Sequence, residues 1–209
     1  INVHYSLLPK LRGAAPVYGA LREGLSKTGV TIQFLAEELD AGDIILQEEV
    51  AIREEDNRGT LTERLTEIGV DLLLEAIALI ERGEAEPRPQ DHEAATYVGR
   101  VMTDDCRIDW SAPAEDIRNL VRACTPWPGA WCTLRGRRLK VLDGNSVQNK
   151  LSEEGEPGEI VEMPKGSGPI VRAGRGAVEL VCLQPEGKQP MSGAEFLRGA
   201  RLEIGDRFE

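Results

Sequence analysis

GVTIQFL at residues 29–35 and IILQEEVAI at residues 44–52 form the stretch that decides the fold. Each segment is short and rich in β-branched and apolar residues, which is typical of a buried strand. Between them, Asp40-Ala41-Gly42 has the composition of a tight turn. The sequence therefore predicts two strands joined by a connection that carries a carboxylate.

A long amphipathic helix is expected after these strands. Thr60 and Glu63 match a capping box, apolar residues then recur at helical spacing, and Gly83 supplies an end. Upstream, residues 1–5 are typical of a strand end and residues 16–24 of a helix. The order strand, helix, strand, strand, helix predicts an α/β fold.

The second half of the chain has a different pattern. Residues 84–94 are polar and proline-bearing, which indicates a linker. A helix is predicted from Ser111, its N-cap, to about Ala123, and a second one starts at a capping box of Ser192 and Glu195. Short strands separated by glycine-rich turns are predicted at residues 131–134, 139–142, 158–161, 170–173 and 178–183.

Regularly spaced short strands predict a small β-barrel. We therefore expect three parts: an α/β domain over residues 1–83, a linker over residues 84–94, and a barrel domain over residues 95–209.

The charge of the chain is unevenly distributed. The formal net charge is −11, yet residues 98–209 hold 16 Lys and Arg against 17 Asp and Glu. This excludes nucleic-acid binding through bulk charge but leaves room for a local basic surface. No apolar run reaches the length of a membrane span, and no signal-peptide pattern is present. The four cysteines form no C-x-x-C pair, which favours reduced core thiols and no metal site.

Asn2 and His4 carry the most informative chemistry. Side chains alternate across a strand, so two residues spaced by one point the same way. An amide donor and a titratable imidazole are then presented together, and Asp40 is available to orient the imidazole. This combination is suited to acyl transfer.

Several motifs carry a family resemblance. Asn2-x-His4, Ser6-Leu7-Leu8-Pro9, residues 12–16 (RGAAP) and residues 39–43 (LDAGD) resemble the folate-dependent formyltransferases. In the second half, residues 108–110, 126–131 and 183–192 resemble the members that formylate initiator methionyl-tRNA. The agreement covers nearly the whole chain in order.

The resemblance implies a fold, a reaction and partners. Residues 1–83 would be the C-terminal part of a Rossmann-like formyltransferase domain, followed by an oligonucleotide-binding-like barrel. A formyl group would pass from 10-formyltetrahydrofolate to the α-amine of methionine on initiator tRNA, without a metal. The chain would lack roughly the first third of the enzyme and be inactive alone. We expect a cytoplasmic monomer, with an organellar targeting segment left open.

Catalytic roles follow from the resemblance. Asn2 would donate its amide to the oxyanion of the tetrahedral intermediate, and His4 would exchange protons between the attacking amine and the leaving folate nitrogen. Asp40 would support the imidazole directly or through a water. Arg12 would contact an anionic ligand or pair with Asp43, and both alternatives stay open.

The resemblance also implies binding roles. The pterin end of folate would lie against Ser6, Leu7, Leu8 and Pro9, whereas Gly13 and Gly42 would serve backbone geometry. Phosphates of tRNA would be contacted by at least two of Arg135, Arg137, Arg138 and Lys140, with Lys188 as a further candidate; a solvated basic turn is the alternative. Trp127 and Trp131 are expected in the core, with stacking on nucleic-acid bases as the alternative. His92 is expected at the surface.

Two rival functions remain at this stage. A formyltransferase for a small amine or a formyl-folate hydrolase would share Asn2, His4 and Asp40. An inactive fragment that only binds nucleic acid is the second rival. The motifs of the second half argue against the first rival.

Overall fold

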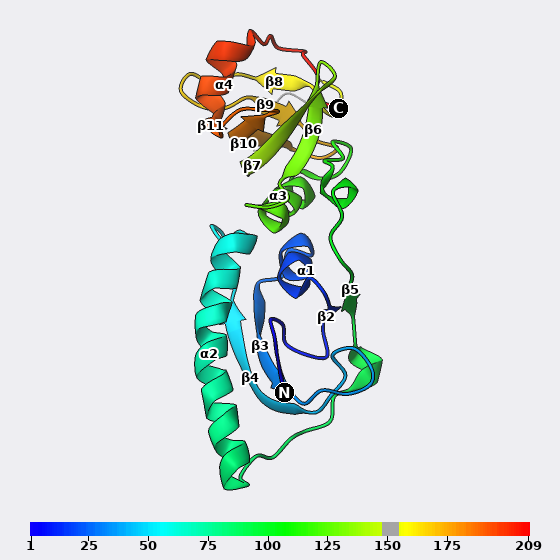
Figure 1. Cartoon of the computed structure of the whole chain (residues 1–209). Coiled ribbons are helices and arrows are strands. Elements are labelled where there is room, and N and C mark those ends of the chain that lie inside the picture. The colour runs from blue at the N-terminus through cyan, green and yellow to red at the C-terminus, as the bar shows by residue number, and fades with distance from the viewer. Residues whose placement is uncertain (148–154) are drawn as a thin grey trace. The chain divides into compact units, whose positions relative to one another are not determined.

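The computed structural model describes residues 1–147 and 155–209. These form two compact units, Ile1–Val101 and Met102–Glu209, which are drawn from blue to green and from green to red (Figure 1). The first unit contains β1 (Asn2–His4), β2 (Arg12–Gly13), α1 (Pro16–Arg22), β3 (Lys27–Gln33), β4 (Ile44–Ala51), α2 (Arg58–Arg82), the 3-10 helix η1 (His92–Ala94) and β5 (Tyr97–Val98). The predicted α/β fold is confirmed.

The first unit is built on an antiparallel sheet of order β1-β3-β4, with a separate parallel pair of β2 and β5. Helix α2 packs along β3 and β4 (Figure 1). A Cβ on Gly69 of α2 would lie 3.3 Å from Val3 and 3.6 Å from Val30, so a small residue lets the helix approach the apolar face of the sheet. The opposite face is polar, because it carries His4 of β1 and its register partner Thr31 of β3. The predicted catalytic residues Asn2 and His4 lie on this polar face.

The start of α2 differs from the prediction. The N-cap is Asn57, whose side chain accepts from the backbone N–H groups of Gly59 and Thr60, and the reciprocal contact of the capping box comes from the Thr60 hydroxyl. The predicted box of Thr60 and Glu63 is therefore wrong, since Thr60 already lies within the first helical turn. Gly83 ends the helix in a left-handed conformation, as predicted.

The boundary between the units also differs from the expected linker at residues 84–94. Arg88 exchanges two backbone hydrogen bonds with Ile44 of β4, and Gln90 is buried within the first unit. The first unit continues to Val101 for this reason. The polar, proline-bearing segment is therefore extended, but it is hydrogen-bonded to the start of β4 and does not act as a free linker.

In the residues that the structure describes, the second unit is a largely antiparallel β structure with two α-helices and a short 3-10 helix. Its sheet has the order β6-β7-β10-β9-β8, and β11 pairs with β10. The elements are η2 (Asp104–Cys106), α3 (Ala114–Cys124), β6 (Ala130–Leu134), β7 (Arg137–Val147), β8 (Ile160–Glu162), β9 (Ile170–Arg172), β10 (Ala177–Pro185), β11 (Met191–Ser192) and α4 (Gly193–Ala200). All five predicted strands are present.

Of the two predicted helix starts in this unit, that of α4 is confirmed and that of α3 is wrong. The capping box of Ser192 and Glu195 starts α4 as predicted. Helix α3 begins at Ala114, so the predicted N-cap at Ser111 is wrong. The Ser111 hydroxyl instead donates to Asp109 at 2.6 Å. The first N–H of α3 instead donates to the carbonyl of Arg175.

The C-terminal segment links the two ends of the sheet. Phe208 donates its N–H to Gly158 beside β8, and Glu209 exchanges backbone hydrogen bonds with Thr133 of β6. Both outer strands are thereby capped by one segment. No helix in residues 1–147 or 155–209 combines the length and apolar character needed to cross a bilayer.

Asp56 anchors the turn before α2 and yields a stability prediction. Burial would raise the pKa of its carboxyl, but hydrogen bonds from Arg64 and from the N–H of Arg53 outweigh burial, so the pKa lies below the ordinary value of 3.8. A lowered folded-state pKa stabilises the fold above the unfolded-state pKa, and this stabilisation is lost as the pH falls through the folded-state value. Asp56→Asn should therefore lower the free energy of unfolding by about 2 kcal/mol at pH 7.

The difference in free energy of unfolding between the wild type and Asp56→Asn should be smaller at pH 3 than at pH 7, as measured by urea denaturation at both pH values. The exposed Asp71 of α2 provides a matched control, and Asp71→Asn should change stability by less than about 0.5 kcal/mol. A gap of equal size at pH 7 and pH 3 would contradict the assignment.

Candidate functional site

His4 lies on the polar face of the first sheet and is almost fully buried, with 5% of its surface exposed. Its Nε2 lies 2.9 Å from the carbonyl oxygen of Leu11. A carbonyl only accepts, so Nε2 carries a hydrogen and donates it. The other ring nitrogen, Nδ1, is then the one that can gain or lose a proton.

Asp40 faces that second nitrogen. One carboxylate oxygen lies 3.6 Å from His4 Nδ1, which is an ion pair when the imidazole is protonated and is longer than a hydrogen bond. The same oxygen accepts the N–H of Gly13 at 2.8 Å, and the other accepts from Gln33 Nε2 at 3.1 Å. The structure therefore brings His4 and Asp40 together, although 36 positions separate them in the sequence.

Asn2 lies on the same face of the sheet as His4. Its register partner on β3 is Gln33, whose amide reaches Asp40. Directly opposed residues of an antiparallel pair point to the same side. Asn2 is half-buried, and by this register it points to the side of the sheet on which His4 faces Asp40.

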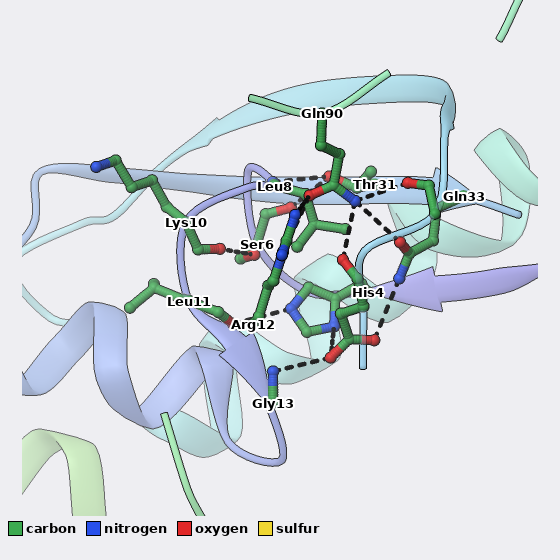
Figure 2. Close-up of polar contacts among 12 residues, drawn as sticks. His4, Ser6, Leu8, Lys10, Leu11, Arg12, Gly13, Thr31, Gln33 and Gln90 are labelled. Atoms are coloured by element: carbon green, nitrogen blue, oxygen red, sulfur yellow. Dashed lines mark hydrogen bonds and ion pairs between the residues drawn. The ribbon is translucent and has the colours of Figure 1, made fainter. Parts of the chain in front are cut away.

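The loop after β1 is fixed to the sheet by a set of hydrogen bonds (Figure 2). Thr31 Oγ1 donates to the carbonyl of Ser6 and accepts the N–H of Leu8, and Gln47 Nε2 donates to the carbonyl of Leu8. The Ser6 hydroxyl donates to the carbonyl of Lys10 at 2.6 Å. These contacts fix the position of the loop beside His4.

The four residues predicted to bind the cofactor occupy different environments. Ser6 and Leu8 are buried, at 0% and 3% exposure, and hold the loop in place. Leu7 and Pro9 are half-buried and keep apolar surface accessible. Within this loop, Leu7 and Pro9 are thus the side chains available to a ligand.

Gly13 and Gly42 serve close backbone approach, as expected. A Cβ on Gly42 would lie 1.9 Å from the carbonyl oxygen of Phe34, and Gly13 has a φ of +110° with the Val98 carbonyl next to it. Neither position has room for a side chain. The Gly13 N–H itself binds the Asp40 carboxylate, and the Gly42 carbonyl accepts from Gln90.

A polar network behind Asp40 was not predicted. Arg12 is 1% exposed and donates from Nε and Nη2 to Gln90 Oε1, at 3.2 and 2.7 Å. Neither open alternative for Arg12, an anionic ligand or Asp43, describes these hydrogen bonds. His92 is exposed, as predicted, and its Nδ1 lies 3.4 Å from Arg12 Nη2. Arg12 and Gln90 lie 78 positions apart in the sequence, so no local sequence pattern predicts their contact.

In the second unit, the predicted basic residues divide between a turn and a strand. Arg135 and Gly136 both have positive φ and form the two-residue turn between β6 and β7. The Arg135 guanidinium contacts Asp206 at 2.9 Å and the carbonyl of Arg201 at 3.3 Å. Arg135 therefore holds the C-terminal segment.

The remaining basic residues lie along β7 and beyond β10. The Arg138 guanidinium stacks 4.0 Å from the ring centre of Trp131, and Lys140 is the register partner of Trp131. Arg137, Arg138 and Lys188 line a groove of about 770 Å³. The groove is also lined by Leu134, Arg135, Leu139, Pro185, Glu186, Met191, Glu195, Phe196, Gly199 and Ala200.

The two tryptophans differ. Trp131 is buried, as predicted, and its indole N–H donates to the carbonyl of Thr103. Trp127 is 68% exposed, so its predicted place in the core is wrong. The proline-flanked segment turns this ring outward instead of packing it.

The four cysteines all lie in the second unit. Cys106, Cys124 and Cys132 are buried thiols and Cys182 is half-buried. Burial raises the pKa of Cys132 to about 12, so it is not a thiolate at neutral pH. Within the described ranges, no three His, Cys, Asp or Glu side chains gather as metal ligands would.

Comparison with protein families defines the class. Residues 1–77 match the formyl transferase family, and residues 100–201 match the formyl transferase C-terminal domain. The chain therefore belongs to the formyltransferase family, with the mixed α/β fold of that family and a central sheet consistent with a Rossmann-like domain.

Relatives within the family are named methionyl-tRNA formyltransferase. The protein from Bacillus cytotoxicus is 42% identical over 205 residues, covering 98% of this chain and 65% of the relative. The protein from Fusobacterium nucleatum is 41% identical over 208 residues, covering 100% and 67%. The chain thus spans about 65% of the length of the first of these relatives.

A solved structure supports the fold. HypX from Aquifex aeolicus in complex with tetrahydrofolic acid superposes with a TM-score of 0.70 at 23% identity, covering 93% of this chain and 34% of that one. At this identity the match establishes the fold alone.

Proposed function

We propose that this chain carries the formyl-transfer centre of a methionyl-tRNA formyltransferase. A formyl group passes from 10-formyltetrahydrofolate to the α-amine of methionine esterified to initiator tRNA. The observation that carries the proposal is the pair of His4 Nδ1 and Asp40, 3.6 Å apart on the face that also presents Asn2. The names of the relatives at 41–42% identity favour this substrate over a small amine.

Asn2 stabilises the charge that develops during transfer. The amine attacks the formyl carbon, and the formyl oxygen becomes an oxyanion in the tetrahedral intermediate. An amide N–H aimed at such an oxygen contributes roughly 10²–10³ in rate. Asn2 has a half-buried side chain on the strand that holds His4, which suits this role.

His4 moves the proton. Its Nε2–H donates to Leu11, so the proton released by the attacking amine is accepted at Nδ1. The imidazolium that forms is stabilised by the carboxylate of Asp40, and the proton then passes to the folate nitrogen as the C–N bond breaks. General acid–base catalysis of this kind contributes about 10²–10⁴ in rate.

The folate lies against the loop of residues 6–9. Leu7 and Pro9 offer apolar surface next to the catalytic face, whereas Ser6 and Leu8 act indirectly by fixing the loop. A mostly apolar wall with a few polar groups suits the flat pterin ring. The formyl donor is a co-substrate, and the proposal requires no metal.

The second unit holds the tRNA. Arg137, Arg138 and Lys188 line one groove of this unit and are the candidates for phosphate contact, with Lys140 on the face of Arg138. The Arg135 guanidinium forms an ion pair with Asp206, so Arg135 stabilises the fold of this unit and does not contact phosphate. We also infer that this unit is a small oligonucleotide-binding-like barrel, because residues 205–209 connect β8 with β6.

The reaction is tested in the longest natural chain that contains these 209 residues. With 10-formyltetrahydrofolate and methionyl-tRNA, formylmethionyl-tRNA should form, and Asn2→Ala should lower kcat by about 10²-fold. The exposed Asn145 of β7 gives a matched control, and Asn145→Ala should leave kcat unchanged. Turnover of a sugar nucleotide without formylation of tRNA, or release of formate alone, would contradict the proposal.

The tRNA surface is tested by the salt dependence of binding. Neutralising Arg137, Arg138 and Lys188 to Gln together should weaken binding and reduce the slope of log K against log salt by about 2, because released counterions set that slope. Fluorescence titration of tRNA binding at about 50 to 200 mM salt measures this slope, because phosphate contacts change the affinity strongly over that range. Arg82→Gln, on the exposed end of α2, is the control, and an unchanged slope in the triple variant would refute the assignment.

A further inference from the structure

Gln90 connects the segment after α2 to the turn that holds Asp40. Its side chain is 6% exposed. The amide Nε2 donates to the carbonyl oxygen of Asp40 at 2.8 Å and to that of Gly42 at 2.7 Å. Gln33 Oε1 lies 3.2 Å from the same nitrogen (Figure 2). One side chain therefore contacts the backbone of the turn at two places.

Arg12 fixes which way this amide points. A guanidinium has only donors, and Arg12 directs two of its nitrogens at Gln90 Oε1. The amide nitrogen then faces the carbonyl oxygens, which only accept. Reversing the amide would oppose donor to donor and acceptor to acceptor, so its orientation is determined by its partners.

The turn needs such a restraint. Asp40 has a φ of +51°, in the left-handed region, which costs a non-glycine residue about 1–2 kcal/mol. Residues of this kind persist only where their surroundings hold them. The carboxylate of Asp40 is held by Gly13 and Gln33, and its carbonyl by Gln90.

We propose that Gln90, oriented by Arg12, is a positioning residue that keeps the Asp40 carboxylate opposite His4 Nδ1. This inference rests on the proposed catalytic role of His4 and Asp40. Without the Gln90 donors, the Asp40 backbone relaxes toward the right-handed region and its carboxylate leaves the imidazole. The effect falls on the chemical step, because the buried Gln90 amide acts on the backbone of the turn that carries Asp40.

Two variants of Gln90 test the proposal. Gln90→Leu removes the amide at similar size. Gln90→Glu keeps the contact with Arg12 but turns a carboxylate oxygen toward the carbonyls of Asp40 and Gly42. Both should lower kcat by about 10- to 100-fold, in line with the cost of a small misplacement. KM for both substrates should stay within about twofold, because substrate-binding groups are untouched.

A spectroscopic measurement on the 209-residue chain separates positioning from stability. The chain has two histidines, so ¹⁵N spectra of the imidazoles resolve His4, whose signals should shift in both Gln90 variants. Asn57→Ala, which removes the N-cap of α2 in the same unit, is the control: it should lower Tm and leave kcat and the His4 signals unchanged. If Gln90→Leu does not fold, Gln90→Glu and the milder Arg12→Lys give the same readouts.

The outcomes are distinct. Lower Tm with wild-type kcat and unchanged His4 signals in the Gln90 variants would overturn the inference. Shifted His4 signals in a protein that does not formylate methionyl-tRNA would support the positioning of Asp40 and refute the proposed function. A fall of kcat with shifted His4 signals supports both.

Discussion

The carboxylate of Asp40 is the group on which the rest of the first unit converges. It lies in a turn with a left-handed backbone, between β3 and β4, and it faces the one nitrogen of His4 that is not already donating to a carbonyl. Gly13 and Gln33 bind its two oxygens. A carboxylate held in this way can stabilise an imidazolium without reorganising, which is how preorganised charge accelerates proton transfer.

The fold supplies this arrangement by giving the sheet two different faces. Val3 and Val30 pack toward α2, while Asn2, His4 and Thr31 point to the other side, where the loop of residues 6–9 is pinned. Stability and chemistry are therefore assigned to opposite faces of the same strands. The polar side chains that hold the loop also keep the buried backbone groups satisfied.

Much of this could be predicted from the sequence because the signals are local. Strand alternation placed Asn2 and His4 together, β-branched runs located β3 and β4, and Gly83 marked the end of α2. Long-range partners could not be predicted. The contacts of Gln90 with Arg12 and with Asp40 span 78 and 50 positions, and a single polar residue in an apparent linker has no periodicity to reveal them.

Other errors have the same physical origin. Thr60 and Ser111 were chosen as caps because of their residue type, yet neighbouring side chains and a distant carbonyl satisfied the helix ends instead. Trp127 was expected in the core because the prolines and the glycine that flank it suggested packing at a corner, yet its ring is 68% exposed. Composition constrains what a residue can do, but tertiary partners decide which option is used.

The central claim is that His4 and Asp40 act as one proton-transfer unit, and a double-mutant cycle tests it most directly. Single-turnover formyl transfer is measured for the wild type, His4→Asn, Asp40→Asn and the double variant. The account predicts that each single variant loses about 10²-fold or more and that the double variant loses little beyond the worse single one. Multiplicative losses, in which the double variant falls by the product of the two single effects, would contradict it.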